Sequence, residues 1–192
     1  MGRLANVEDE VAWLRSVRDT ACRLTTMYQA GELPLRVTHN DTKINNVLFD
    51  ESGREAIVVI DLDTVMPGLV GHDFGDAIRF AANTAEEDCT DLKKVAVDLE
   101  LYRAFAEGFL SMTGKSLIQA EKDTLAVSCV CMTVEVALRF LEDYLRGDVY
   151  FRISHPRHNL ERARCQIALA KSMLEHLDEM EQIVADCLSH LS

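Results

Sequence analysis

The sequence predicts a mostly helical domain of the α+β class that carries one small β-hairpin. Apolar residues recur every three or four positions over the first thirty residues and again from Asp76 to the end of the chain, which is the period of an α-helix with one buried face. Between these parts, two short apolar runs flank the polar segment DESGRE, which is typical of two strands joined by a turn. With 192 residues, the chain is expected to form a single domain, 1–192, with its own hydrophobic core.

The elements follow in order from these patterns. A first helix is predicted over 7–30, and Gly31 and Pro34 end it. A short apolar stretch, 35–38, then leads into the polar segment HNDTKINN. The hairpin strands are expected at 47–49 and 56–60, and further helices at 73–83, 88–113, 116–146 and 156–190.

Composition limits the classes of function. The net charge of −12 disfavours binding to nucleic acid, because an acidic protein repels phosphates. No apolar run is expected to reach the length of a membrane span, and the N-terminus is acidic and polar rather than a signal peptide. A cytoplasmic location is the default expectation. Cys129 and Cys131 form a C-x-C pair without a second pair nearby, so buried reduced thiols are expected rather than a zinc site.

The most informative segment is 39–46, which fits the pattern H-x-D-x-x-x-x-N of phosphoryl-transfer catalytic loops. Phosphoryl transfer needs a carboxylate to accept the proton of the attacking hydroxyl, and Asp41 is the candidate base. Asn46 is the candidate metal ligand through its amide oxygen, and Lys43 is placed to reach the transferred phosphate. His39 is expected to orient this loop through hydrogen bonds.

A second carboxylate is needed to hold the metal, and the hairpin supplies Asp61. It lies fifteen residues after Asn46, at the end of the second predicted strand, and a hairpin brings its two ends together. The apolar residues 57–60 are expected to anchor this strand in the core, where a carboxylate is costly unless a cation meets it. Asp63 is a candidate for contact with a second metal or a substrate hydroxyl, and a local cap of the following turn is the alternative.

A competing candidate is Asp73, which begins a D-F-G triplet. It lies twenty-seven residues after Asn46, beyond Pro67 and Gly68, so the hairpin geometry favours Asp61 as the metal ligand. Asp73 is interpreted as a structural residue. It is expected either to cap a helix that begins near Asp76 or to hydrogen-bond the catalytic loop.

The segments HNDTKINNVLFD, VVIDLDTVMPG and HDFGDAIRF resemble the aminoglycoside phosphotransferase and choline kinase superfamily. Within it, the sequence looks most like the N-acetylhexosamine 1-kinases and similar sugar kinases, and the likeness continues through EVALRFLEDYLRGDVYF and HNLERARCQIALA. The resemblance implies a protein-kinase-like C-terminal helical lobe that uses ATP and Mg²⁺. In these terms, 39–46 is the catalytic loop, 47–63 the metal-binding hairpin and 73–190 the helical substrate-binding part.

The resemblance also implies two substrate-binding residues, Arg139 and Tyr150, because in the sugar kinases an arginine and a tyrosine of the helical lobe help to hold the sugar. The residues themselves leave alternatives open. Arg139 could instead pair with Glu135 or Glu142 at helical spacing, and Tyr150 could be an ordinary core contact.

The N-terminal lobe of such kinases is expected to be absent. No Gly-rich loop or strand-borne lysine precedes His39, and Lys43 is the first lysine in the chain. The chain is therefore expected to be a fragment of a longer kinase or a product that lost this lobe. An exposed apolar surface should remain, which would favour self-association or a partner chain.

These inferences favour ATP-dependent phosphorylation of a hydroxyl on a small polar substrate, most simply an (N-acetyl)hexosamine at its anomeric position. One alternative is a catalytically inactive lobe that serves as a partner or regulatory module. Another is a kinase for an aminoglycoside or a choline-like substrate, whose positive charge would suit the acidic chain.

Overall fold

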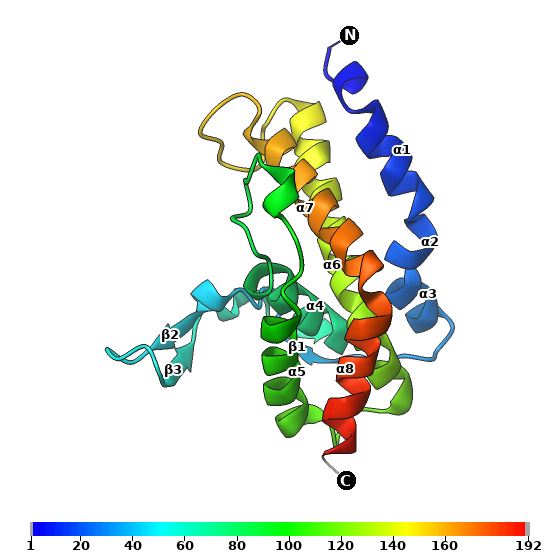
Figure 1. Ribbon diagram of the computed structural model, residues 1–192, viewed down its shortest axis with the longest axis vertical. Coiled ribbons are helices and arrows are strands. Elements are labelled where there is room, and N and C mark those ends of the chain that lie inside the picture. The colour runs from blue at the N-terminus through cyan, green and yellow to red at the C-terminus, as the bar shows by residue number, and fades with distance from the viewer. Residues whose placement is uncertain (1, 191–192) are drawn as a thin grey trace.

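Helices make up most of the computed structural model, which describes residues 2–190 (Figure 1). Its α-helices are α1 (Glu8–Ser16), α2 (Arg18–Ala21), α3 (Arg23–Gln29), α4 (Val70–Ala81), α5 (Leu99–Thr113), α6 (Gln119–Arg146), α7 (His158–Glu175) and α8 (Leu177–Ser189). Its strands are β1 (Arg36–Thr38), β2 (Val47–Phe49), β3 (Ala56–Val59) and β4 (Met66–Gly68). The mostly helical α+β class is confirmed.

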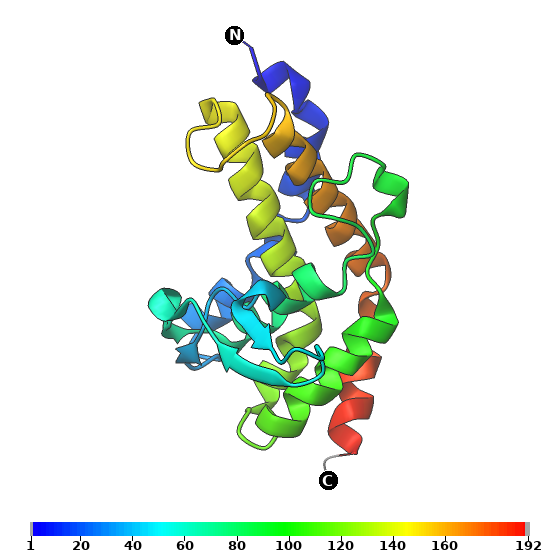
Figure 2. The same ribbon diagram turned by 90° about the vertical axis from the view of Figure 1, so that its left-hand side faces the viewer.

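The long helix α6 is the centre of the fold. It packs most extensively against α7 and α4, and the two views show α6 and α7 running side by side (Figures 1 and 2). By length and composition alone α6 could cross a membrane, so the expectation that no run was long enough is wrong. However, 72% of its most apolar window is buried inside the fold, as expected of a core helix.

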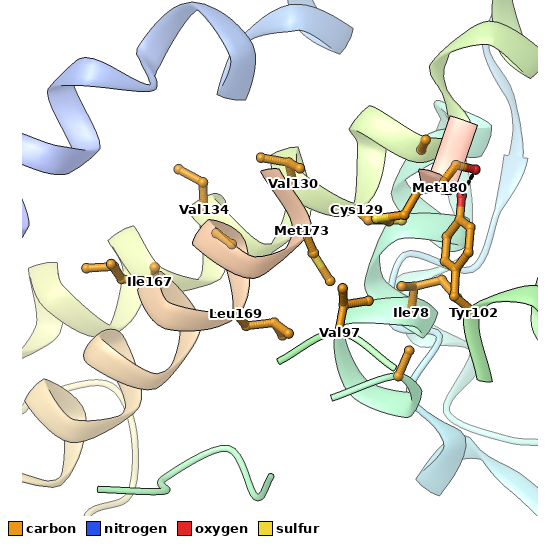
Figure 3. Packing of buried hydrophobic residues seen from close by; sticks show 14 of the residues in the cluster. Ile78, Val97, Tyr102, Cys129, Val130, Val134, Ile167, Leu169, Met173 and Met180 are labelled. Atoms are coloured by element: carbon orange, nitrogen blue, oxygen red, sulfur yellow. Dashed lines mark hydrogen bonds between the residues drawn. The ribbon is translucent and has the colours of Figure 1, made fainter. Parts of the chain in front are cut away.

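The core joins α6 and α7 to α4, α5 and α8 (Figure 3). At one end of it, the buried hydroxyl of Tyr102 donates a hydrogen bond to the carbonyl oxygen of Met180 at 3.3 Å. All six cysteines are unpaired, and Cys129 and Cys131 are buried. Burial raises the pKa of both thiols, which favours the protonated form expected of structural cysteines.

Several predicted helix boundaries are wrong. The single helix predicted over 7–30 is three short helices, with breaks at Val17 and Cys22, and the one predicted over 156–190 is divided at His176. The apolar periodicity continues across these breaks, so it could not reveal them. The helix predicted from residue 88 begins only at Leu99, where the side chain of Asp98 caps its first N–H groups.

Two separate two-stranded antiparallel sheets flank the catalytic-loop segment. In one, β2 pairs with β3, and Val47 lies opposite Val59, which confirms the predicted hairpin. In the other, β1 pairs with β4, and Thr38 lies opposite Met66. This second sheet was not predicted.

The hairpin projects away from the helices (Figure 1), and this overturns the expectation that its second strand is anchored in the core. All four residues of β3 are exposed, and so is Ile60. A continuous apolar run fits a strand with both faces covered. Here it belongs to a strand that no other part of the described chain covers.

Candidate active site

The start of α4 holds the backbone of the catalytic-loop segment. The carboxylate of Asp73 accepts the backbone N–H of His39 at 2.8 Å through one oxygen and that of Asn40 at 2.7 Å through the other. Because α4 begins at Val70, Asp73 lies inside the helix, and the alternative that it caps a helix near Asp76 is wrong. Its contacts are those of the other alternative, hydrogen bonding to the loop.

The residue before Asp41 turns the chain. Asn40 has φ +63°, a left-handed conformation that asparagine tolerates better than most residues. Its side chain donates to the carbonyl oxygen of Thr64 at 3.0 Å and accepts from the hydroxyl of Thr38 at 3.0 Å. The hydroxyl of Thr64 in turn donates to the carbonyl oxygen of His39 at 2.7 Å. These bonds tie the loop to the segment that follows the hairpin.

The residue after Asp41 is held by α4 as well. The backbone N–H of Thr42 donates to Oδ2 of Asp76 at 3.1 Å, and its hydroxyl donates to the carbonyl oxygen of Asp73 at 2.6 Å. Asp41 itself therefore lies between two residues whose backbones are fixed from the same helix.

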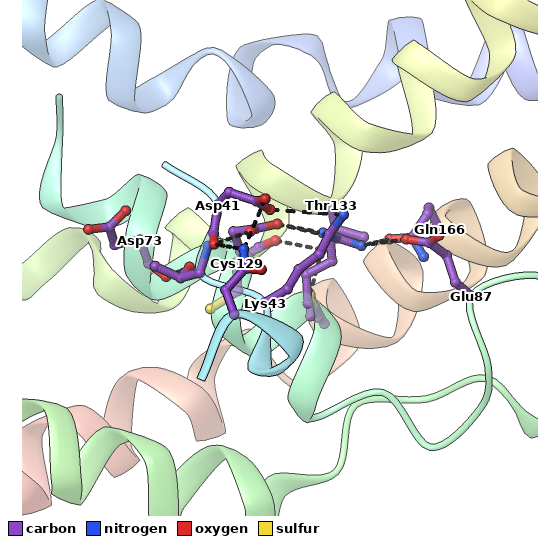
Figure 4. Close-up of polar contacts among 12 residues, drawn as sticks. Asp41, Lys43, Asp73, Glu87, Cys129, Thr133 and Gln166 are labelled. Atoms are coloured by element: carbon purple, nitrogen blue, oxygen red, sulfur yellow. Dashed lines mark hydrogen bonds and ion pairs between the residues drawn. The ribbon is translucent and has the colours of Figure 1, made fainter. Parts of the chain in front are cut away.

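Asp41, Lys43 and Asn46 lie together, as the spacing of the motif requires. Nδ2 of Asn46 donates to Oδ2 of Asp41 at 3.0 Å and to its carbonyl oxygen at 2.9 Å. Nζ of Lys43 lies 3.9 Å from Oδ1 of Asp41, and both side chains are partly exposed. Figure 4 shows Asp41 and Lys43 pointing toward one another.

The hairpin returns Asp61 to the neighbourhood of Asn46. The N–H of Ile60 donates to the carbonyl oxygen of Asn46 at 2.9 Å. Asp61 is the next residue in the chain, so its backbone begins close to that of Asn46. Asp61 has φ +61° and ψ 54°, a left-handed conformation that costs a non-glycine residue about 1 kcal/mol or more. Ring Nε2 of His39 lies 3.1 Å from the carbonyl oxygen of Ile60 and ties the loop to this strand end.

Negative charge gathers around Asp61. The neighbouring carboxyl of Asp63, through hydrogen bonding and then charge repulsion, raises the pKa of Asp61, and burial and Asp41 add to the effect while His39 opposes it. A site where neighbouring carboxylates raise the pKa of Asp61 is one where a cation is favourable.

The donor set fits Mg²⁺ bound together with a nucleotide. Within residues 2–190, there is no cluster of three or more His, Cys, Asp or Glu side chains that could hold a metal by themselves. Mg²⁺ instead commonly uses one or two protein oxygens and completes its shell with waters and substrate phosphates. Asp61 offers a carboxylate. Asn46 directs its NH₂ group to Asp41, which leaves its amide oxygen, Oδ1, as the atom that could bind a metal.

A cavity of about 330 Å³ opens beside Asp41, and Lys43 and Arg139 help to line it. Arg139 forms no ion pair with Glu135 or Glu142 among the described residues, and Glu142 pairs instead with Arg146 at 2.9 Å. Its guanidinium carbon instead lies 5.9 Å from the ring centre of Tyr150 and 5.6 Å from that of Phe151, within the range of cation–π attraction.

Tyr150 lies apart from the predicted base. Its side chain is 73% exposed, so the alternative of a core contact is wrong. It lines a neighbouring cavity of about 390 Å³ that also contains Arg139, and Phe151 lines the cavity of Asp41, as does Phe140.

The loop that carries these aromatic residues is held by one buried carboxylate. Asp143 accepts the backbone N–H groups of Val149, Tyr150 and Phe151 at 2.8–2.9 Å, and Nδ2 of Asn159 at 2.8 Å. Burial raises the pKa of Asp143, but these hydrogen bonds outweigh it and the pKa lies below its usual value.

Sequence reasoning missed several residues of this region. Asp76, Arg79 and Glu87 all line the cavity beside Asp41. The D-x-x-R spacing of Asp76 and Arg79 on one helix was a usable signal, since residues three apart on a helix face one another. No local signal marked Glu87, which reaches the site from the segment after α4.

A comparison with protein families agrees with the resemblance of the sequence motifs. The family model described as "Phosphotransferase enzyme family" (APH) matches residues 2–109, which is more than half of the 192 residues. The matched part includes the catalytic-loop segment, both sheets and α4.

Proposed function

We propose, because the chain belongs to the phosphotransferase enzyme family, that it carries the catalytic residues of a small-molecule kinase. In this reaction the γ-phosphoryl group of ATP, bound with Mg²⁺, passes to a hydroxyl of a small polar substrate. The proposal treats residues 1–192 as one catalytic domain, with the loop 39–46 at its centre.

The observation that carries the proposal is the contact between Asp41 and Asn46. Asn46 donates to Oδ2 of Asp41 at 3.0 Å and so fixes the carboxylate while its own amide oxygen remains for a metal. Asp41 also lines the 330 Å³ cavity, whereas Asn46 and Asp61 do not. The base therefore lies between the candidate acceptor cavity and the candidate metal ligands, which is the order that transfer between two bound substrates needs.

The residues take the following roles. Asp41 accepts the proton of the attacking hydroxyl, and Lys43 stabilises negative charge on the phosphoryl group as it moves. Asn46 and Asp61 would hold Mg²⁺, which would supply positive charge to neutralise the phosphate oxygens. Asp73, Asn40 and His39 keep the loop in place.

The cavity favours a monosaccharide as the acceptor, and we propose an (N-acetyl)hexosamine phosphorylated at its anomeric hydroxyl. A volume of about 330 Å³ lies at the small end of the range for ligand sites. Arg139 supplies hydrogen-bond donors near the rings of Tyr150 and Phe151, and Phe151 lines the same cavity. Sugars bind to such combinations of polar groups and aromatic faces.

The test is a panel of acceptors incubated with the full chain, ATP and Mg²⁺, with phosphorylated products identified by phosphorus NMR. The panel should include hexosamines, N-acetylhexosamines, neutral hexoses, aminoglycosides and choline. We expect transfer to the N-acetylhexosamines, with the phosphate on the anomeric oxygen. Transfer to a cationic acceptor alone would refute the sugar proposal and leave the kinase proposal standing.

The matched control for the base is a second aspartate change. Asp41→Asn should remove turnover, whereas Asp19→Asn, at an exposed position on α2, should leave it unchanged. If turnover survives Asp41→Asn, the base has been assigned wrongly. If no acceptor is phosphorylated by a chain that binds ATP and Mg²⁺, a non-catalytic partner module is the better description.

A further inference from the structure

A buried arginine lies next to the catalytic loop and takes no part in the roles described so far. Arg79, in the last turn of α4, is 2% exposed. Its Nε and Nη2 donate to Oδ1 of Asp76 at 3.0 and 2.8 Å, and its Nη1 donates to Oε1 of Glu87 at 3.0 Å. Arginine is suited to such a position, because its planar group makes several directed bonds at once and always carries its charge.

Through Asp76, the hydrogen bonds of Arg79 connect to the catalytic loop. While Oδ1 of Asp76 receives two bonds from Arg79, Oδ2 accepts the backbone N–H of Thr42 at 3.1 Å. Thr42 is the residue directly after Asp41. The guanidinium therefore sets the orientation of the carboxylate that holds this N–H.

Through Glu87, the hydrogen bonds of Arg79 connect to the wall of the proposed acceptor cavity. Glu87 belongs to the segment 82–98 between α4 and α5, and both Glu87 and Arg79 line the 330 Å³ cavity beside Asp41 and a larger neighbouring one of about 760 Å³. Figure 4 shows polar contacts running from Asp41 and Lys43 at one end to Gln166 and Glu87 at the other.

We propose that Arg79 is a positioning residue: through Asp76 it holds the backbone after Asp41, and through Glu87 it couples this backbone to the segment that walls the acceptor cavity. Its importance for phosphoryl transfer rests on the proposed function. The coupling itself does not, because it is a property of hydrogen bonds within the chain. A purely structural arginine would stabilise the whole fold without acting on one amide of the loop.

The first experiment measures backbone amide exchange of the full chain by NMR. Arg79→Gln should raise the exchange rate of the Thr42 N–H by about tenfold, the effect of losing roughly one hydrogen bond. The N–H groups of His39 and Asn40 are internal controls, because Asp73 holds them and they should change less than about twofold. Arg79→Lys, which keeps the charge, should restore part of the protection.

Glu87 tests the coupling to the cavity wall. Glu87→Ala should also raise the exchange rate of the Thr42 N–H, whereas Glu86→Ala should not. Glu86 is the matched control because it is the preceding residue, its side chain is exposed, and it makes no ion pair among residues 2–190.

The second experiment compares kcat with KM for an acceptor that the wild-type chain phosphorylates. Arg79→Gln should lower kcat by about tenfold or more, leave KM for ATP within about twofold, and be partly rescued by Arg79→Lys. Equal effects on kcat and on the KM values of both substrates would overturn the positioning role in catalysis.

Failure of this inference and failure of the proposed function give different results. If the Thr42 amide exchanges at the wild-type rate in Arg79→Gln, or if all amides of the chain accelerate equally, the inference is wrong whether or not the chain is active. If the Thr42 amide alone accelerates and no acceptor is phosphorylated by the wild-type chain, the coupling stands and the proposed function is refuted.

Discussion

Asp73 accepts the backbone N–H of Asn40 at 2.7 Å, so that α4 directly supports the residue before Asp41. The other carboxylate oxygen accepts the N–H of His39. A single side chain thus fixes two successive peptide groups of the catalytic-loop segment. An ionised carboxylate suits this role, because both of its oxygens act only as hydrogen-bond acceptors.

The first prediction concerns this carboxylate. Asp73→Asn replaces one acceptor oxygen with an NH₂ group that faces a backbone donor. We expect the free energy of unfolding to fall by about 1–3 kcal/mol and kcat to fall by more than tenfold, because the loop loses its support. Urea unfolding and steady-state kinetics measure the two effects, and an unchanged kcat would show that the loop holds its shape without Asp73.

The second prediction concerns the packing of α4 on α6. A Cβ at Gly75 would lie 2.5 Å from the carbonyl oxygen of Ser128 and 2.8 Å from Cγ of Met132. Gly75→Ala should therefore destabilise the fold by about 1–3 kcal/mol. Gly108→Ala in α5 is the control, because a Cβ there meets no atom within 4 Å, and it should stabilise the fold by up to about 1 kcal/mol. Equal urea unfolding midpoints for Gly75→Ala and Gly108→Ala would contradict the close contact at Gly75.

The third prediction concerns the proposed metal ligands. Asp61→Asn and Asn46→Ala should each raise, by at least about tenfold, the Mg²⁺ concentration that supports half-maximal binding of a non-hydrolysable ATP analogue. Calorimetric titration measures this without any turnover. Asp63→Asn tests whether that residue contacts the metal: a similar loss makes it a metal contact, whereas a wild-type response excludes this and leaves a substrate contact or a local cap. If Asp61→Asn binds the metal normally, Asp61 is not a ligand.

The fourth prediction concerns Asp143 and pH. Its pKa in the folded chain lies below the usual value of an aspartate, which is about 3.9 when unfolded. The stability that the carboxylate contributes is therefore fully present above about pH 4 and is lost as the pH falls through the folded-state pKa. Asp143→Asn should cost about 2 kcal/mol at pH 7 and should flatten the fall in stability below pH 4. Thermal unfolding at several pH values checks both effects, and parallel pH profiles for the two proteins would contradict them.

The hairpin and its neighbours show what the sequence could and could not predict. Turn residues between two apolar runs are a local signal, so the meeting of Asn46 and the end of β3 was predictable. The exposure of β3 was not, because an apolar run is compatible with a buried strand and with one that nothing in the described chain covers. The pairing of β1 with β4 joins Thr38 to Met66 across 28 positions, and no short-range pattern records such a pairing.

The helices, and the hydrogen bonds that support the catalytic loop, likewise divide into features with a local sequence signal and features without one. Apolar periodicity identified the cores of α4, α5, α6 and α7, because each buries one face. It could not place the break at His176, where neither glycine nor proline interrupts the pattern. Within the site, the motif predicted that Asp41, Lys43 and Asn46 meet, and hydrogen bonding of Asp73 to the loop was one of two alternatives. The bonds of Asp76 and Glu87 depend on the packing of distant segments.

The exposed hairpin has a thermodynamic consequence. A ribbon of two short strands with no layer on either face is only marginally stable by itself, so it should open more readily than the helices around α6. Asp61 stands at the end of this ribbon. If Asp61 binds a metal–nucleotide complex as proposed, part of the free energy of binding must offset the cost of stiffening the ribbon. We then expect nucleotide binding to show an unfavourable entropy that a crosslink between β2 and β3 would reduce.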